Sequence, residues 1–454
     1  MNRDNGFLSP QGSLSPLGIE LTRRVWLGKA ASIAFGSWML GRGPLNAGQT
    51  SKPIRSCIVL WMVGGASQLD TFDLKPGHRN GGPFQEIDTS VPGIRISEHL
   101  PMIAQRAEHL AIIRSMSTIE GDHSRATRHL STGFEPRLNI EHPHLGSLIA
   151  NERRDEQRSI PNFVTISPPA SIGQLAGFLG SKFAPLAIRP TVVDAGRPDE
   201  PNSRVVSLGV ENLTPPTGIS STKLEQRSGL LHYFNEHFAA RQPDLVSTSH
   251  RIAYERAGRL MDPTAARAFD LTEEPAAIRA AYGSDAFGQG CLLARRLVER
   301  GVGFVEVRMD GSFNNWDTHA ENFNQVQTLS GELDRPWSRL LDDLKERGLL
   351  DSTLVVWMGE FGRTPVINSG TGRDHFPAAW STVLAGASVR GGQVIGQTSP
   401  DGMTVKDRPV SVPDFLATLL IALGIDPGKQ NVSKDGQPIR LVDQAAKPLI
   451  ELLG

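Results

Sequence analysis

The sequence has few cysteines and almost no net charge, and each of these features excludes a class of protein. Cys57 and Cys291 are its two cysteines among 454 residues. Two are too few for a disulfide framework or for zinc held by cysteines alone, so we expect two buried apolar side chains or a single disulfide. Lys and Arg number 47 and Asp and Glu number 48, which leaves a formal net charge of -1. We therefore expect no general affinity for nucleic acid or for an anionic membrane.

The sequence also lacks an apolar run that is long enough to cross a membrane as a stable helix. The best candidate, residues 30–40, is short and contains serine and glycine. It follows Arg23 and Arg24 in LTRRVWLGKAASIAFGSWML, which is the pattern of a twin-arginine signal. We expect residues 1–48 to be a signal peptide, cleaved near Ala47 after recognition by the twin-arginine export machinery, and the mature protein to be periplasmic or secreted. The alternative is an amphipathic N-terminal helix of a cytoplasmic protein.

Short apolar runs alternate with helical patterns through the rest of the chain. The run SCIVLWMVGG, Ser56 to Gly65, has the pattern of a central strand that is buried on both faces. Similar runs predict further strands at 110–117, 162–167, 303–309, 353–359 and 381–386. Helices are predicted at 290–301, 329–348 and 411–425. This alternation predicts an α/β fold with a mostly parallel central sheet flanked by helices.

The region from Pro185 to Ala286 differs from its surroundings. We expect no strands there, because polar, proline-containing sequence gives way to helical segments such as LVSTSHRIAYERAGRLM. We predict that residues 49–454 form one α/β domain in which residues 185–286 are a helical cap or insertion. The alternative is that these helices simply cover the sheet.

Charged and polar residues gather where the predicted strands end, which is where parallel sheets place their working groups. Four strand ends carry such residues: Asp70 after the first strand, His123, Ser124 and Arg125 after the second, Asp317 and His319 after 303–309, and Glu360, Arg363, Asp374 and His375 after 353–359. Singly, each has an ordinary explanation as a helix cap or a surface residue. Their coincidence at one edge predicts a metal-binding hydrolytic site.

The residue types at these strand ends suit chemistry on an oxyanion. Carboxylate and imidazole ligands together hold zinc, manganese or a similar divalent ion. A metal beside a serine hydroxyl lowers its pKa and stabilises charge on a phosphoryl or sulfuryl group. Arginine can hold the ester oxygens through paired hydrogen bonds, and Arg125, Arg363 and Arg373 are candidates.

The chain resembles a secreted bacterial family called domain of unknown function 1501. The resemblance extends from Cys57 to the C-terminus and is carried by LWMVGGASQLDTFDLKPG, EGDHSRATRHLSTGF, GFVEVRMDGSFNNWDTHAENF, GEFGRTPVINSGTGRDHFPAAW and GGQVIGQTSPDG. That family is similar in fold to the alkaline phosphatase and arylsulfatase superfamily. The resemblance therefore implies an alkaline phosphatase-like fold with two metal ions bridged by a nucleophile at a helix N-terminus.

Laid onto this chain, the resemblance implies roles for individual residues. Ser124 stands at the position of the nucleophile, and the other catalytic candidates are His123, Arg125 and Arg363. The candidate ligands of a zinc, manganese, calcium or magnesium ion are Asp70, Asp317, His319, Glu360, Asp374 and His375.

Two departures from the superfamily pattern narrow the expected chemistry. Phe361 follows Glu360 where the superfamily has a histidine, so a second metal would take His123 instead, bind weakly or be absent. A Cys-x-Pro-x-Arg signature is missing, which disfavours formylglycine sulfatase chemistry. The expected function is an exported metal-dependent hydrolase of a phosphate or sulfate ester, on a small molecule or a polysaccharide. The alternative is a degenerate member that binds an envelope glycan or a protein without turnover.

Overall fold

The structure is a computed structural model of the chain. It describes residues 56–136, 140–155, 158–167, 175–194, 204–210, 220–241, 245–310 and 315–454. The expected signal peptide, residues 1–48, and its cleavage site lie outside these ranges. Within them, no helix has the length and apolar character that a membrane span requires. Cys57 and Cys291 are both buried free thiols, which confirms the expectation of two buried side chains and not that of a disulfide.

A 10-stranded sheet forms the centre of the described residues, in the order β13-β4-β12-β9-β1-β8-β5-β6-β7 with β16 beside β4. The strands are β1 (Ser56–Met62), β4 (Leu110–Ser117), β5 (Phe163–Ile166), β6 (Leu186–Asp194), β7 (Arg204–Gly209), β8 (Phe304–Met309), β9 (Thr353–Met358), β12 (Trp380–Gly386), β13 (Gln393–Ile395) and β16 (Val410–Ser411). The central pairs β9–β1, β1–β8, β8–β5 and β5–β6 are parallel, whereas β12 and β7 are antiparallel to their neighbours. The predicted mostly parallel sheet is confirmed.

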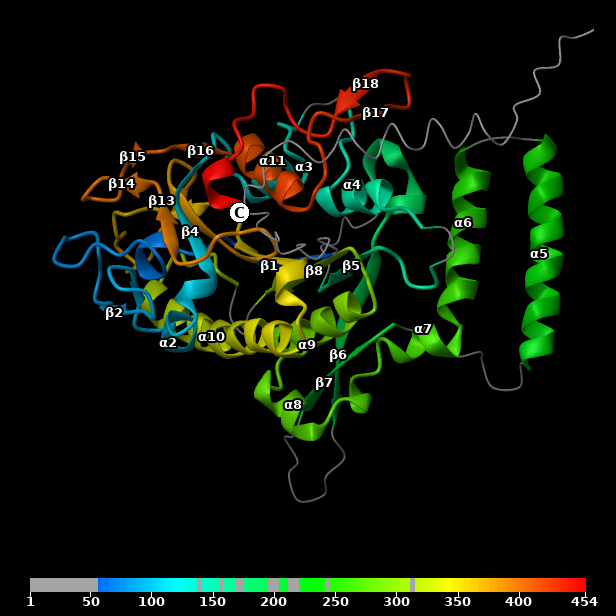
Figure 1. Ribbon diagram of the computed structural model, residues 1–454, viewed down its shortest axis with the longest axis horizontal. Coiled ribbons are helices and arrows are strands. Elements are labelled where there is room, and N and C mark those ends of the chain that lie inside the picture. The colour runs from blue at the N-terminus through cyan, green and yellow to red at the C-terminus, as the bar shows by residue number, and fades with distance from the viewer. Residues whose placement is uncertain are drawn as a thin grey trace, which may run out of the picture. The chain divides into compact units, whose positions relative to one another are not determined.

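Helices cover both faces of this sheet (Figure 1). They are α2 (Pro101–Ala104), α3 (His123–Thr132), α4 (Leu145–Glu152), α5 (Ser221–Arg241), α6 (Leu245–Leu260), α7 (Pro263–Arg267), α8 (Ala276–Ala281), α9 (Ala286–Glu299), α10 (Asn322–Glu346) and α11 (Val412–Ala422). Alternate side chains of β1 enter two different cores, as the period of a strand requires. Ile58 and Leu60 belong to the core that includes α9 and α10, and Val59 and Trp61 to the core that includes α3, α4 and α11. The prediction that β1 is buried on both faces is confirmed.

The region 185–286 contains two strands before its helices, so the expectation that strands are missing there is wrong. Strand β6 pairs in parallel with β5 through residues 186–188 and antiparallel with β7 through residues 189–194. Arg189 and Pro190 interrupt the apolar pattern of this segment, which hid the strand from the sequence. Pro190 is tolerated because β6 has by then passed the end of β5, and proline is accepted where one side of a strand is unpaired. The helices α5 to α8 follow, and their role as a cap remains a prediction.

Glycines allow the loops at the carboxyl ends of β1 and β8 to approach each other closely. Gly64 follows β1 with a φ of +99°, and a Cβ atom there would lie 2.4 Å from Asn315 Oδ1 and 2.5 Å from Asp317 N. Any other residue would push the two loops apart or strain the backbone. Gly64 therefore fixes where the β8 loop, with its candidate metal ligands, can sit.

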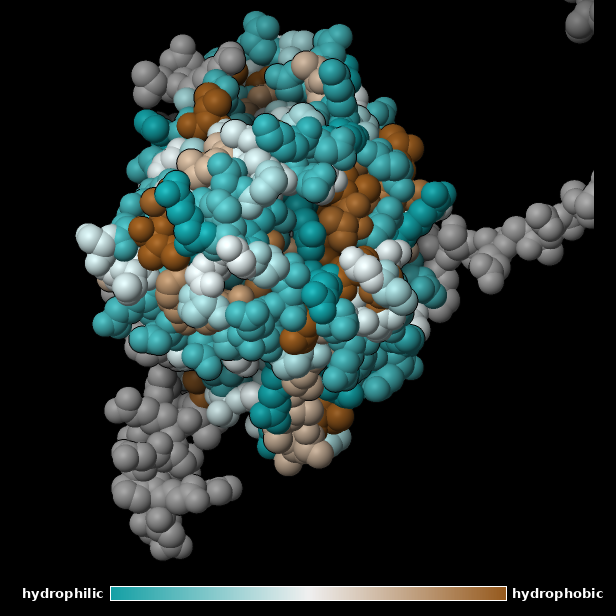
Figure 2. Space-filling model, turned by 90° about the vertical axis from the view of Figure 1, so that its left-hand side faces the viewer, coloured by the Kyte–Doolittle hydropathy of each residue, from teal (hydrophilic) through white to brown (hydrophobic). Residues whose placement is uncertain are grey.

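Four two-stranded ribbons complete the described strands. They are β2 (Glu86–Asp88) with β3 (Arg95–Ser97), β10 (Gly362–Arg363) with β11 (His375–Phe376), β14 (Gln397–Thr398) with β15 (Val405–Asp407), and β17 (Gln430–Val432) with β18 (Pro438–Arg440). In the ribbon β10–β11, Arg363 is paired with His375. The face of the molecule in Figure 2 is mainly hydrophilic, with separated hydrophobic areas, as is usual for a protein surface.

Candidate metal centre

Three strand ends, those of β4, β8 and β9, bring candidate side chains to one edge of the sheet. Asp317 and His319 lie between β8 and α10, and Glu360 follows β9 directly. His123 is the first residue of α3, which follows β4, and His375 lies in β11. The carboxyl ends of β1, β4, β8 and β9 point the same way, which is why residues so far apart in sequence meet.

The carboxylate of Asp317 is the point at which three histidines converge. Its Oδ1 lies 3.1 Å from His319 Nε2 and 3.3 Å from His375 Nε2, and its Oδ2 lies 3.2 Å from His123 Nε2. The Nε2 atoms of His319 and His375 are themselves 3.1 Å apart. The ligand atoms of His123, Asp317 and His375 all lie within 4.8 Å of one another.

The other ring nitrogen of each histidine faces an oxygen that can only accept a hydrogen bond. His123 Nδ1 is 2.8 Å from Glu360 Oε1, His319 Nδ1 is 2.9 Å from Asp374 Oδ1, and His375 Nδ1 is 2.8 Å from the carbonyl oxygen of Gly121. Nδ1 is therefore the donor in all three rings. When Nε2 carries no proton, as metal binding requires, each ring turns the lone pair of Nε2 inward, toward Asp317.

Glu360 is held in place from behind, so that it can orient His123. It is 2 % exposed, Oε1 accepts from Gly64 N at 2.8 Å, and Oε2 accepts from Trp61 Nε1 at 3.1 Å. Both donors belong to β1 or to the turn that follows it. The structure thus places Glu360 behind a histidine and Asp374 behind another, whereas Asp317, His319 and His375 of the predicted ligands meet at one point.

Arg363 is bound to protein groups and not directed at a cavity. Its side chain is fully buried, Nη2 lies 2.5 Å from Asp317 Oδ1, and Nε donates to the carbonyl oxygen of Gly65 at 3.1 Å. Nη2 also donates to the carbonyl oxygen of Gly64. Arg363 therefore fixes the orientation of Asp317 and the turn after β1.

The pKa values of His123 and Asp317 shift in opposite directions, because each group stabilises the charged form of the other. Burial lowers the pKa of His123, but hydrogen bonding to Asp317 and Glu360 and their charges outweigh burial and raise it to about 9. Burial raises the pKa of Asp317, but His123 and Arg363 outweigh it and hold that pKa well below its usual range. A cation at Nε2 of His123, whether a proton or a metal ion, is therefore favoured.

Three observations indicate that His123, Asp317, His319 and His375 suit the binding of a divalent ion. His123 Nε2 is shielded from solvent and makes no aligned hydrogen bond within the described residues, although Asp317 is near. Two Nε2 atoms face each other at 3.1 Å, where at most one could carry a hydrogen. Ligands at about 2.0–2.2 Å from a tetrahedral zinc-sized ion are roughly 3.3 Å apart, which is close to the 3.2, 3.1 and 3.3 Å between Asp317 and the Nε2 atoms of His123, His319 and His375. The group whose ligand atoms all lie within 4.8 Å of one another is His123, Asp317 and His375, without His319. The donor set of three imidazoles and one carboxylate suits zinc or manganese better than calcium.

Ser124 and Arg125 lie in the first turn of α3, next to His123. Asp122 caps this helix, and its Oδ1 accepts from Arg125 N at 3.0 Å. Both side chains are exposed, but they differ in surroundings. Ser124 lines a cavity together with His123 and Asp317, whereas Arg125 Nε donates to Glu120 Oε2 at 2.8 Å. The structure brings Ser124, and not Arg125, to the wall of that cavity.

Asp70 has other partners than the histidine cluster. Its carboxylate pairs with Arg373, whose Nε and Nη2 lie 2.8 Å and 3.1 Å from Oδ2 and Oδ1. Asn322 Nδ2 and Ser67 Oγ also donate to Oδ2, at 2.9 Å and 2.5 Å. Asp70 and Arg373 are both fully buried. This pair joins the loop after β1 to the loop that precedes β11.

Sequence reasoning missed the residues that line the cavity beside the cluster. The cavity has a volume of about 570 Å³ and includes Arg128, His144, Arg308 and Asn315 in its wall. Arg308 could have been found, because an arginine within the apolar strand GFVEVRM requires a partner or a purpose. Arg128 and His144 carry no comparable signal.

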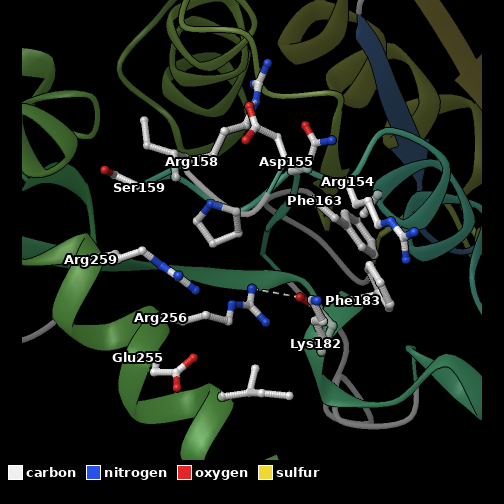
Figure 3. A pocket seen from close by; sticks show the side chains of 16 residues that line it. Arg154, Asp155, Arg158, Ser159, Phe163, Lys182, Phe183, Glu255, Arg256 and Arg259 are labelled. Atoms are coloured by element: carbon white, nitrogen blue, oxygen red, sulfur yellow. Dashed lines mark hydrogen bonds and ion pairs between the residues drawn. The ribbon is translucent and has the colours of Figure 1, made fainter.

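A second cavity, of about 290 Å³, lies beside α6 and shares no lining residue with the first. Figure 3 shows Arg154 and Arg158 on one side of it and Arg256 and Arg259 on the other. Arg256 donates to the carbonyl oxygens of Ser181 and Ala184, at 3.0 Å and 2.9 Å. The side chain of Arg256 therefore caps a turn of the chain, and none of the predicted site residues lies in this cavity.

Comparison with known proteins gives a family. No curated protein sequence matches the chain. Similar solved structures include a sulfatase from Pseudoalteromonas sp., with 12% identity, a TM-score of 0.40 and coverage of 83% of this chain and 68% of that chain. A protein in the alkaline phosphatase superfamily from Vibrio parahaemolyticus has 10% identity, a TM-score of 0.38 and coverage of 88% and 71%. The model of the family described as Protein of unknown function (DUF1501) matches residues 54–453, and the chain belongs to that family.

Proposed function

We propose that the protein is a metal-dependent hydrolase of a phosphate or sulfate ester, exported by the twin-arginine route and active outside the cytoplasm. One observation carries the proposal. Three histidines have Nδ1 fixed by an acceptor, and each turns Nε2 toward the carboxylate of Asp317. Histidine ligands of metals are oriented in this way by an outer acceptor. We assign His123, Asp317, His319 and His375 as ligands of a divalent ion.

A bound ion would polarise an ester oxygen and lower the pKa of a nearby hydroxyl. Glu360 and Asp374 hold His123 and His319 in orientation, so both are positioning residues. Arg363 holds Asp317 and is not among the residues that line the cavity, which changes the role that the sequence suggested.

Ser124 is the candidate nucleophile. It follows His123 directly and lies in the first turn of α3, where free backbone N–H groups favour negative charge. Its exposed side chain lines the cavity. In the proposed step Ser124 Oγ forms a bond to the phosphorus or sulfur atom, the bond from that atom to the alcohol oxygen breaks, and the serine proton passes to the leaving alcohol. Water then breaks the bond to Ser124 Oγ, which releases phosphate or sulfate and restores the hydroxyl.

The test is hydrolysis of 4-nitrophenyl phosphate and 4-nitrophenyl sulfate by the zinc-loaded and manganese-loaded chain. Ser124→Ala is expected to abolish release of 4-nitrophenol, and Ser124→Thr, which keeps a hydroxyl, to retain part of it. Equal rates for wild type and Ser124→Ala would remove Ser124 as nucleophile.

A second candidate function is binding of an envelope glycan or a protein without turnover. The observation in its favour is Phe361, which is fully buried and packs its ring 4.8 Å from that of His123 and 4.7 Å from that of His375. An apolar ring thus occupies the side of the cluster where a further ligand could have stood. A metal-loaded chain that hydrolyses neither ester but binds a glycan would support this second function.

A further inference from the structure

The cavity beside the metal centre offers polar and cationic groups that the proposed reaction does not use. It has a volume of about 570 Å³. Its wall includes His123, Asp317 and Glu360 of the metal centre, and its cationic groups are Arg128 and Arg308. A cavity of this size is larger than a phosphate or sulfate group alone and can hold a sugar-sized molecule.

Helix α3 forms a hydroxyl-bearing wall of the cavity. Ser124, Thr127, Arg128 and Ser131 line it at spacings of i, i+3, i+4 and i+7, which places them on one face of the helix. Hydroxyls donate and accept hydrogen bonds, so such a wall matches the hydroxyl groups of a polyol. Arg128 is exposed, and no hydrogen bond or ion pair of its guanidinium is found among the described residues.

Arg308 lies at the end of β8 and is 8 % exposed. Its guanidinium carbon is 5.1 Å from the ring centroid of Trp61, whose Nε1 donates to Glu360. The guanidinium has five N–H donors, but within the described residues it makes one hydrogen bond, at 3.3 Å, to Glu306 Oε1. Glu306 is shared with His144, whose Nε2 lies 3.1 Å from Oε2. The side chain of Arg308 is thus held in one orientation, and most of its N–H groups can donate hydrogen bonds to a ligand.

The acidic side chains of the cavity wall lie near other protein groups. Glu360 and Asp317 bind the histidines and Arg363. Glu141 lies 3.9 Å from Lys434. Arg128 and Arg308 therefore give the cavity wall a positive character.

We propose that this cavity binds the body of the substrate, and that the substrate is an ester of a polyol with a second anionic group, which Arg308 and Arg128 hold. The ester group to be cleaved lies at the metal centre, the hydroxyls of the polyol lie against α3, and the second anion lies at the two arginines. This inference rests on the proposed function, because it extends the same site.

The experiment measures binding by calorimetry, so it does not require turnover. The probes are two matched pairs: glucose 6-phosphate with glucose 1,6-bisphosphate, and N-acetylglucosamine 6-sulfate with N-sulfoglucosamine 6-sulfate. In at least one pair, zinc-loaded wild type is expected to bind the doubly substituted sugar about tenfold more tightly or better, the effect of one charge-assisted hydrogen-bond pair. Arg308→Gln is expected to reduce this ratio to below about threefold, and Arg308→Lys to give an intermediate ratio.

Two further variants keep the result decisive. Arg128→Gln changes an exposed side chain, and it is expected to lower the ratio even if Arg308→Gln fails to fold. Arg154→Gln removes an exposed arginine from the other cavity (Figure 3) and is expected to leave the ratio unchanged. A wild type without preference in either pair, or a preference that survives in both Arg128→Gln and Arg308→Gln, would overturn the inference.

The failure of this inference is distinguishable from failure of the proposed function. A chain that binds metal and cleaves 4-nitrophenyl esters but shows no preference retains the proposed function and loses the substrate class. A chain with an arginine-dependent preference but no hydrolysis retains the anion subsite and loses the hydrolase.

Discussion

Replacing Glu360 by glutamine tests whether the outer acceptors prepare the histidines for a metal. The carboxylate has three partners within hydrogen-bond distance: Gly64 N at 2.8 Å, Trp61 Nε1 at 3.1 Å and His123 Nδ1 at 2.8 Å. A glutamine that keeps its oxygen toward Gly64 and His123 must turn its NH₂ group toward the indole N–H. Two donors then face each other in a site that is 2 % exposed.

Two separate effects follow from this change. One lost, buried hydrogen bond costs about 1–3 kcal/mol of unfolding free energy in the metal-free chain. Loss of the charged acceptor behind a metal ligand lowers metal affinity by about 10–100-fold. We expect a value near the lower limit, because Asp317 and Glu360 together raise the pKa of His123 to about 9, and losing the charge of Glu360 lowers that pKa and so reduces competition by the proton.

Zinc titration calorimetry and urea denaturation of the metal-free protein measure the two effects separately. Asp374→Asn is the matched control, since Asp374 holds His319 in the same way but with a side chain that is 54% exposed. Its effect on zinc affinity is expected to be smaller than that of Glu360→Gln. A Glu360→Gln variant that loses stability but keeps the zinc affinity of wild type would refute the assignment of Glu360 as a positioning residue of the metal centre.

Three further predictions concern the frame around the site. Asp70→Asn breaks a buried ion pair with Arg373 and is expected to lower the free energy of unfolding, measured by urea denaturation, by about 3–5 kcal/mol. If Asp70→Asn reduced the affinity for zinc as much as His375→Ala does, Asp70 would be a metal ligand. Gly64→Ala places a Cβ atom 2.5 Å from Asp317 N and is expected to lower both the melting temperature and zinc content; an unchanged zinc content would contradict the close approach of the loops. Burial would raise the pKa of Glu306, but His144 and Arg308 outweigh burial and lower that pKa from 4.5 to about 2. The ionised carboxylate therefore contributes about 3 kcal/mol to the free energy of unfolding above about pH 4.5, and this contribution is lost as the pH falls toward 2. The stability advantage of wild type over Glu306→Gln should therefore shrink across that window in urea titrations, and a constant difference would contradict it.

The strands of the sheet follow from local sequence, because a strand buried on both faces must be apolar at every position. SCIVLWM shows this at β1, and its two sets of alternate side chains enter two cores. Strand β6 was missed because Arg189 and Pro190 are explained only by its neighbours, β5 and β7. The strand propensity of a residue does not show whether a neighbouring strand pairs with it on one side or on both.

The sequence predicted that candidate residues lie close together, but not which of them face a common point and which orient a histidine. Parallel strand ends converge, so Asp317, His319, Glu360 and His375 were predicted at one edge of the sheet. Asp317, His319 and His375 contact one another there, whereas Glu360 contacts His123. Which carboxylate faces a shared point and which stands behind a histidine depends on donors such as Trp61 Nε1, which comes from another strand. The cavity wall likewise combines residues of α3 with Arg308 of β8, which are far apart in sequence, and no local pattern encodes that meeting.

The central claim is that three histidines and Asp317 bind a divalent ion, and elemental mass spectrometry of the purified chain tests it most directly. The variants are His375→Ala and Asp317→Ala, with His232→Ala as a control because that histidine lies on α5 and is exposed. The account predicts about one or two divalent ions per chain in wild type and in His232→Ala, and a large loss in the other two. A metal-free wild type after purification in metal-supplemented buffer, or a metal content that His375→Ala and Asp317→Ala leave unchanged, would contradict it.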